Sequence, residues 1–167
     1  VLFFCLLVIW IGYAQWKKRQ PQDPDNFYSA ENGTPEEKLE KLNAQLAKQP
    51  TALTYTRKAA ILTDLTRYDE ALTALDESTA IAPKDNETAH TQYVAYLRGS
   101  VYLAQERYEE AISCLDKSLK LLPKEEEKTH LHMLSLKASA YFYQQSYEES
   151  LAIFQQILAA TPNDANA

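Results

Sequence analysis

Three stretches of the sequence superimpose without a gap: YDEALTALDESTAIAP (68–83), YEEAISCLDKSLKLLP (108–123) and YEESLAIFQQILAATP (147–162). Each stretch begins with a tyrosine and ends with a proline 15 residues later, and the copies start 40 and 39 residues apart. A repeat period in this range is typical of helical solenoids and other arrays of small structural units. The repeat period by itself therefore indicates an array of small structural units, such as a helical solenoid.

The apolar residues inside each stretch follow the spacing of an amphipathic helix. In the second copy they recur at intervals of three and four residues, at Ala111, Ile112, Leu115, Leu119 and Leu122. Another helical segment precedes each tyrosine, with a small residue aligned at Ala59, Gly99 and Ala138. A small residue lets a neighbouring helix approach closely. The sequence thus predicts three helical hairpins, formed by 52–66 with 68–81, 89–105 with 107–121, and 129–145 with 147–160.

These columns resemble the tetratricopeptide repeat (TPR) family over residues 34–164. The small–small–large signature of that family is present as Ala59/Ala71/Leu75, Gly99/Ala111/Leu115 and Ala138/Ser150/Phe154. The copies are longer than the usual repeat of about 34 residues, and the excess falls after Pro83 and Pro123, where it would lengthen the first helices of the second and third copies. The resemblance implies an all-α helical-hairpin solenoid of three repeats, with hairpins near 52–85, 89–125 and 129–164.

A half-unit precedes the first repeat. The segment TPEE (34–37) has the pattern of a helix start, with a threonine cap, a proline in the first helical position and a glutamate three residues after the cap. We expect an N-terminal capping helix over 35–48, so that the TPR domain covers 34–167. No polar capping helix follows the last hairpin, which leaves two alternatives, a truncated chain or a partner on the apolar face of that hairpin.

Residues 1–14 (VLFFCLLVIWIGYA) carry no charge, and a basic cluster follows at 17–19. Aromatic residues before a basic cluster are typical of a membrane-spanning helix at the interface. The run is shorter than a full span of about 20 residues, and a few apolar residues upstream would complete it. A cleaved signal peptide fits less well because the positive charge follows the apolar run. A lipid anchor at Cys5 fits less well because bulky Phe3 and Phe4 precede it.

We therefore expect a single-pass transmembrane or signal-anchor helix over 1–16 and a juxtamembrane linker over 17–33. The cations that follow the apolar run favour the cytoplasmic side for the repeats. Further cations upstream would reverse this orientation, so the extracytoplasmic side stays open.

Charge and composition exclude several classes of function. The net charge is −6, and all of it falls on residues 34–167, which carry 14 cations and 20 anions. An acidic domain is a poor ligand for nucleic acid. Three scattered glycines cannot build a phosphate-binding loop, and the sequence lacks the Walker, HExxH and CxxC motifs. His130 and His132, two apart on a helix, cannot easily share a metal ion. We expect no catalysis, no cofactor and no metal.

In TPR domains the first helices of successive hairpins line a concave groove that takes peptides or helices from partners. The resemblance places seven residues in this groove: Tyr93, Tyr96, Ser100, Leu103, His132, Phe142 and Tyr143. We expect the tyrosines and the phenylalanine among them to anchor an apolar peptide. Tyrosine suits this role because it combines a large apolar area with a polar hydroxyl group. The alternative is that they pack between hairpins. The cations Arg98 and Lys137 are expected to lay their stems along neighbouring tyrosines.

The function expected from the sequence is a membrane-anchored adaptor that binds a protein or peptide partner. Two alternatives stay open. One is an assembly or quality-control factor outside the cytoplasm, of the kind that serves cytochrome c maturation. The other is a homo-oligomeric structural scaffold that self-associates through the C-terminal hairpin.

Overall fold

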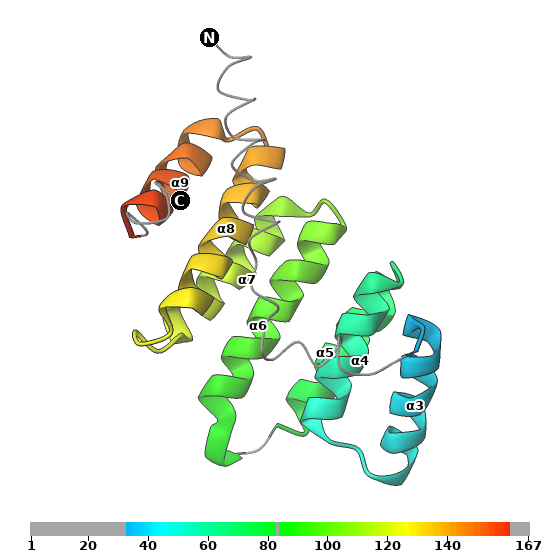
Figure 1. Cartoon of the computed structure of the whole chain (residues 1–167). Coiled ribbons are helices and arrows are strands. Elements are labelled where there is room, and N and C mark those ends of the chain that lie inside the picture. Colours follow the sequence, from blue (N-terminus) through cyan, green and yellow to red (C-terminus); the bar gives the residue numbers. More distant parts are fainter. Residues whose placement is uncertain (1–32, 83, 161–167) are drawn as a thin grey trace. The chain divides into compact units, whose positions relative to one another are not determined.

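The computed structural model describes residues 33–82 and 84–160 (Figure 1). A short 3-10 turn, η1 (Lys84–Asn86), connects two of the α-helices in these ranges. The α-helices are α3 (Pro35–Lys48), α4 (Ala52–Asp64), α5 (Tyr68–Ala80), α6 (Glu87–Ala104), α7 (Tyr108–Leu121), α8 (Glu127–Tyr143) and α9 (Tyr147–Ala160). Residues from Pro35 onward belong to one compact unit. The all-α hairpin architecture predicted from the repeat is confirmed.

The expected membrane helix over 1–16 lies outside the described residues, as does nearly all of the linker over 17–33. Within 33–82 and 84–160, none of the helices combines the length and the apolar character needed to span a bilayer.

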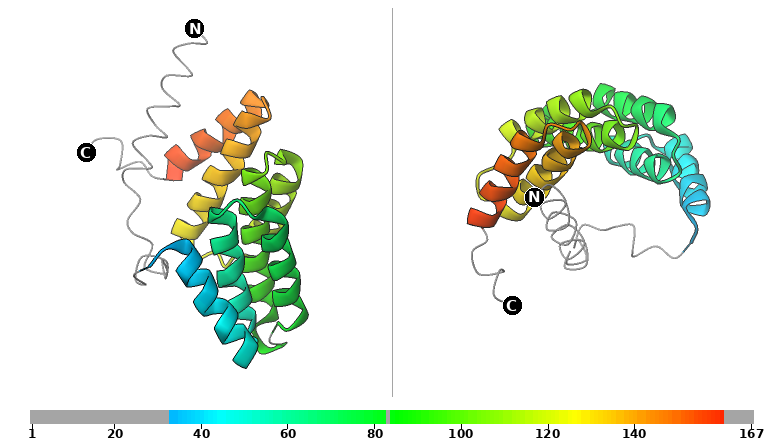
Figure 2. Two further views of the ribbon diagram at one scale, coloured as in Figure 1. Left: turned by 90° about the vertical axis from the view of Figure 1, so that its right-hand side faces the viewer. Right: turned by 90° about the horizontal axis from the view of Figure 1, so that it is seen from above.

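Consecutive helices pack against one another in chain order (Figure 1). In addition, α4 contacts α6 and α6 contacts α8, whereas in the described part of the chain α5 does not reach α7 and α7 does not reach α9. The row of hairpins therefore bends toward its first helices, and Figure 2 shows this curvature from above. Helices α4, α6 and α8 line the concave side of the row, which faces the viewer in Figure 1.

The extra residues of the second and third copies lengthen their first helices, as the sequence predicts. Helix α6 has 18 residues and α8 has 17, against 13 in α4. Glu87 and Glu127 are the first residues of the two longer helices. A carboxylate at this end of a helix interacts favourably with the helix dipole.

The signature columns of the repeat form the core. Six of their side chains are fully buried: Ala59, Ala71, Leu75, Ala111, Leu115 and Ala138. Gly99 allows α6 to pack tightly against Leu115 of α7, because a Cβ atom at this position would lie 2.9 Å from Cγ of Leu115. The small residues are therefore needed for close helix packing within each hairpin.

Buried serines in one column connect the two helices of the first and second hairpins. The Ser78 hydroxyl donates to the carbonyl oxygen of Ala52 at 2.8 Å, and the equivalent Ser118 hydroxyl donates to that of Gln92 at 2.9 Å. Both serines are fully buried. A buried hydroxyl is tolerated when it is hydrogen-bonded in this way. The last repeat has Ile157 in the same column.

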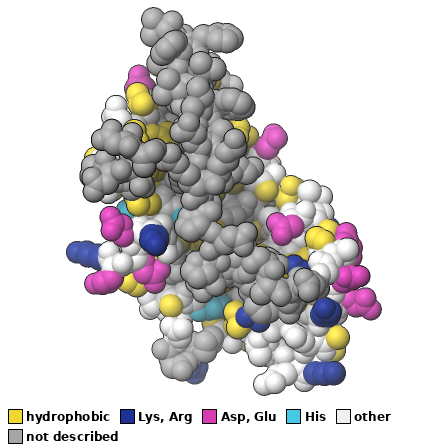
Figure 3. All heavy atoms as spheres, in the orientation of Figure 1, with side chains coloured by type: hydrophobic (Ala, Val, Ile, Leu, Met, Phe, Trp, Pro, Cys, Tyr) yellow, Lys and Arg dark blue, Asp and Glu magenta, His cyan; other side chains and the backbone are white. Residues whose placement is uncertain are grey.

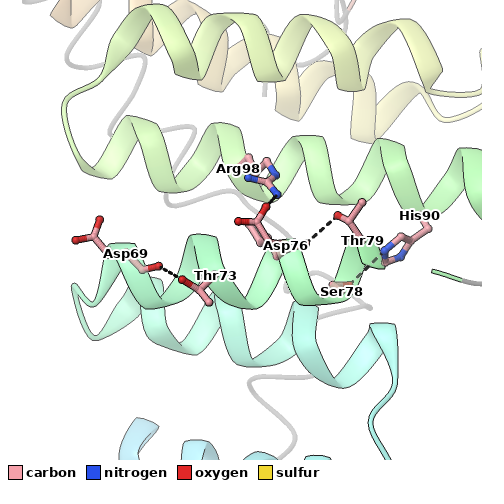
Figure 4. Close-up of polar contacts among 8 residues, drawn as sticks. Asp69, Thr73, Asp76, Ser78, Thr79, His90 and Arg98 are labelled. Atoms are coloured by element: carbon pink, nitrogen blue, oxygen red, sulfur yellow. Dashed lines mark hydrogen bonds and ion pairs between the residues drawn. The ribbon is translucent and has the colours of Figure 1, made fainter. Parts of the chain in front are cut away.

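Ion pairs join consecutive repeats. Figure 4 shows Arg98 of α6 paired with Asp76 of α5, next to a hydrogen bond of 3.2 Å between Ser78 Oγ and His90 Nε2. Lys137 of α8 makes the equivalent pair with Asp116 of α7 at 2.5 Å. The expectation that both cations lie along tyrosines is therefore incomplete. Lys137 also lies 5.8 Å from the centre of the Tyr141 ring, but both cations are held by a carboxylate of the preceding repeat.

The three hairpin turns share a backbone conformation that the sequence does not predict. Thr66, Glu106 and Gln145 occupy equivalent positions and have φ angles of 57°, 61° and 66°. This left-handed conformation commonly ends a helix, and glycine is the usual residue there. Each of these residues has a Cβ atom, and Thr66 is also β-branched, so the turn of the first hairpin is strained.

Replacing Thr66 with glycine should raise the free energy of unfolding by about 1 kcal/mol, because glycine adopts a positive φ without the steric cost of a Cβ atom. Chemical denaturation followed by circular dichroism measures the change. Thr73→Gly is the matched control. Thr73 is exposed inside α5 and donates to the Asp69 carbonyl oxygen at 2.9 Å, so this change should destabilise by about 0.5 kcal/mol. Equal effects at both positions would contradict strain at Thr66.

Candidate partner-binding groove

An aromatic cluster on α6 and α8 spans the second and third repeats on the concave side. Tyr93 and Tyr96 lie three residues apart on α6 and stack with ring centroids 6.1 Å apart. The Tyr96 hydroxyl lies 3.1 Å from Nε2 of His132 on α8, and the two ring centroids are 5.8 Å apart. We call Tyr93, Tyr96 and His132 the aromatic bridge. It joins three of the seven residues expected in the groove.

Tyr93 is the exposed member of the aromatic bridge. It is 40% accessible, whereas Tyr96 and His132 are half-buried. The hydrogen bond to His132 therefore holds Tyr96 in place, and Tyr96 supports one side of the Tyr93 ring. An aromatic side chain that is fixed before binding loses little conformational entropy when a ligand packs on it.

Phe142 and Tyr143 lie at the other end of α8. Tyr143 stacks on Tyr108 at the start of α7, with ring centroids 6.0 Å apart. Phe142 meets Tyr147 at the start of α9 edge to face, with centroids 5.6 Å apart. These four residues form a separate group that we call the turn cluster. Phe142 follows His132 by ten residues, which is about 15 Å along a helix.

The aromatic residues expected in the groove therefore fall into two groups. The aromatic bridge and the turn cluster lie at opposite ends of α8. Sequence reasoning missed Tyr108 and Tyr147, although they are the tyrosines that start the repeated stretches. Desolvation by neighbouring groups, together with the nearby Glu106 and Tyr143, raises the pKa of the Tyr108 phenol.

The two remaining predicted residues lie on α6 beyond the aromatic bridge. The Ser100 hydroxyl donates to the carbonyl oxygen of Tyr96 at 3.2 Å, so it is used within its own helix. Leu103 is half-buried. Each first helix also presents one large exposed apolar side chain, namely Leu53 on α4, Tyr93 on α6 and Tyr143 on α8. Figure 3 shows hydrophobic and histidine side chains on the face of the molecule that contains these helices.

Two of the three histidines, His90 and His132, contact side chains of neighbouring helices. Among the residues that the structure describes, no cluster of three or more histidine, cysteine or acidic side chains is arranged to hold a metal ion. Burial raises the pKa of the Cys114 thiol. A raised pKa keeps the thiol protonated and a weak nucleophile near neutral pH. The contacts of His90 with Ser78 and of His132 with Tyr96 serve packing between helices.

Comparison with known proteins agrees with the repeat. The model of the tetratricopeptide repeat matches residues 50–124 and again residues 91–163, which together cover more than half of the chain. No curated protein matches the chain. The chain is similar to the solved structure titled "MamA RS-1 ArsTM double mutant", with a TM-score of 0.63 and 19% identity over 92% of this chain and 84% of that one. At this identity the likeness concerns the fold alone.

Repeats of this kind imply a scaffold for protein–protein interaction and are typically not enzymes. The repeat period, the buried signature columns and the match over 50–163 agree, and the chain belongs to the tetratricopeptide repeat family.

Proposed function

We propose that this chain is a protein-binding scaffold that holds a peptide segment of its partner against the aromatic bridge of α6 and α8. The observation that carries the proposal is the exposed Tyr93 ring, which stacks on Tyr96 while Tyr96 is held by His132. The bridge combines an accessible apolar face with a positioned polar group. Binding sites for peptides commonly combine these two features, and tyrosine is enriched among the residues that dominate binding.

The chemistry of the groove favours a partner segment with apolar or aromatic side chains. Leu53 on α4 occupies the column of Tyr93 one repeat earlier and adds a further apolar side chain that is 54% exposed. The cations Arg98 and Lys137 are paired with Asp76 and Asp116 of the preceding repeats. They are therefore poorly placed to act as the main recognition groups for an acidic peptide.

A photoreactive phenylalanine analogue in place of Tyr93 tests this proposal in the cells that produce the protein. Illumination should give a discrete adduct whose protein component is identified by mass spectrometry. Adding Tyr96→Ala should reduce its yield about tenfold or more, as expected for a residue that dominates binding. Tyr96→Phe should give an intermediate yield because it keeps the ring and removes the hydrogen bond to His132.

The matched control carries the same analogue at Glu77, an exposed position on α5. Circular dichroism of each variant verifies that the helices are intact. An adduct that also forms from position 77, or that Tyr96→Ala leaves unchanged in a folded protein, would contradict the assignment of the groove.

Membrane anchoring through residues 1–16 is part of the same proposal. Its support is the uncharged apolar run followed by the basic cluster at 17–19. The anchored protein should remain in the membrane fraction after alkaline carbonate extraction, and a reporter fused after Ala167 should be active on the cytoplasmic side. Extraction into the soluble fraction would contradict the anchor, and a reporter active outside the cytoplasm would reverse the orientation.

A further inference from the structure

Helix α9 exposes an apolar stripe. Tyr147, Leu151 and Leu158 are 49%, 50% and 64% accessible, and their spacing of four and seven residues places them on one side of the helix. Among the residues of α9, only Ser150 is fully buried. We call these three side chains the α9 stripe. Large apolar side chains seldom lie next to one another on a protein surface, and where they do they commonly mark an interaction site.

The equivalent positions of α7 show how such a stripe is normally covered. Tyr108, Ile112 and Leu119 occupy the same columns one repeat earlier and are half-buried. Helix α8 packs against α7, where Tyr143 stacks on Tyr108 and Lys137 pairs with Asp116. Helix α6 packs against α5 through the equivalent pair of Arg98 with Asp76. The α9 stripe therefore corresponds to the surface that α5 and α7 each use to pack against the first helix of the next repeat.

The polar column within this face differs in α9. Asp76 of α5 pairs with Arg98 of α6, and Asp116 of α7 pairs with Lys137 of α8. The same column in α9 is Gln155. The carboxylate that would hold the cation of a following repeat helix is thus missing. The surface of α9 suits a helix face that is itself apolar and uncharged.

We propose that the α9 stripe binds the α9 stripe of a second copy of this chain, with the two helices antiparallel. The α9 stripe of a second copy is an apolar and uncharged helix face of the kind that this surface suits. Its charged residues, Glu148 and Glu149, are confined to the first turn. An antiparallel pair separates these carboxylates to opposite ends, whereas a parallel pair would bring like charges together.

The other end of the repeat row is not a suitable partner. The apolar residues Leu39 and Leu42 of α3 are buried, and exposed acidic and basic residues cover its outer side. Figure 3 shows charged side chains along the margin over α3. Head-to-tail stacking of α3 on α9 would bury these charges without partners, which is costly. Pairing of α9 with α9 also closes at two copies, because such an interface is self-complementary.

Mass measurement of the full-length chain in detergent by light scattering, with the detergent contribution subtracted, tests the pairing. The wild-type protein should pass from one copy to two between about 1 and 100 µM, since the contact of two short helices lies near the lower limit of about 1,000 Å² for specific interfaces. The double variant Leu151→Glu with Leu158→Glu should raise the dissociation constant about 100-fold or more. The control Leu53→Glu, at a similarly exposed leucine on α4, should leave it unchanged.

A charge-exchange pair tests the antiparallel arrangement, in which Tyr147 of one copy meets Leu158 of the other. Tyr147→Lys and Leu158→Glu should each weaken association, and an equimolar mixture should restore it through a lysine–glutamate pair. A wild-type protein that stays a single copy over the whole range would overturn the proposal. So would association that survives the double glutamate variant, or a mixture that does not associate.

Discussion

Replacing Leu115 with alanine should lower the free energy of unfolding by about 3 kcal/mol. Leu115 is fully buried on α7, and its side chain contacts the backbone of α6 at Gly99. Removal of three carbon atoms loses their transfer free energy and leaves a cavity that the two closely packed helices can fill only in part. Denaturation by urea, followed by circular dichroism, measures the loss.

A second change at Gly99 separates close packing from general loss of hydrophobic area. In the wild-type protein, Gly99→Ala should destabilise by about 1 kcal/mol. Its new Cβ would lie 2.9 Å from the buried Cγ of Leu115, and the resulting overpacking exceeds the helix-propensity gain of about 1 kcal/mol. In the Leu115→Ala background that contact is absent, so the same Gly99→Ala change should stabilise by about 1 kcal/mol.

The sign of the Gly99 effect is the decisive result. Ala59 and Ala138 occupy the same column in the other repeats, so Ala59→Gly serves as a control that should destabilise regardless of Leu115. A Gly99→Ala effect with the same sign in both backgrounds would contradict a specific contact between Gly99 and Leu115.

Substitution of Ser118 should have the second largest effect on stability. Ser118 is fully buried, donates to the Gln92 carbonyl oxygen at 2.9 Å and accepts from Gln92 Nε2 at 3.0 Å. Ser118→Ala should cost about 1.5 kcal/mol because two polar groups of Gln92 lose a buried partner. Ser118→Ile should cost more than Ser118→Ala, because it removes the same hydrogen bonds and adds volume to a filled space.

Thermal unfolding compared with Ser113→Ala checks this result. Ser113 is an exposed serine on the same helix, and its replacement should change stability little. Since Ile157 stands in the Ser118 column of the last repeat, a mild effect of Ser118→Ile would show that the column tolerates volume in every repeat.

Much of the fold could be predicted because the same pattern occurs three times in the sequence. Three aligned copies give each apolar column three independent observations, and prolines mark where second helices end. Bounds such as Pro35–Lys48 for α3 and the start of α5 and α9 at a tyrosine therefore agree with the structure, and the predicted start of α7 at 107 differs from it by one residue. The left-handed turn residue Thr66 was not predictable in this way, because the usual glycine is absent from all three turns.

The candidate site was predicted less completely. A column position places a side chain on the concave side of its helix, as for Tyr93, Tyr96 and His132. It does not tell how far along the groove that side chain reaches or which neighbour it meets. Tyr143 and Phe142 therefore belong to the turn cluster with Tyr108 and Tyr147, and not to the aromatic bridge.

The sequence by itself determined the all-α class, the phase of the three hairpins and the residues of their core. These properties follow from the periodicity of apolar residues over short stretches, which can be read directly from the sequence. Tertiary structure alone decided that Asp76 pairs with Arg98, that the aromatic residues divide into two groups, and that the α9 stripe stays exposed. These properties depend on distances between helices, and those distances are set by how the packed side chains fit together.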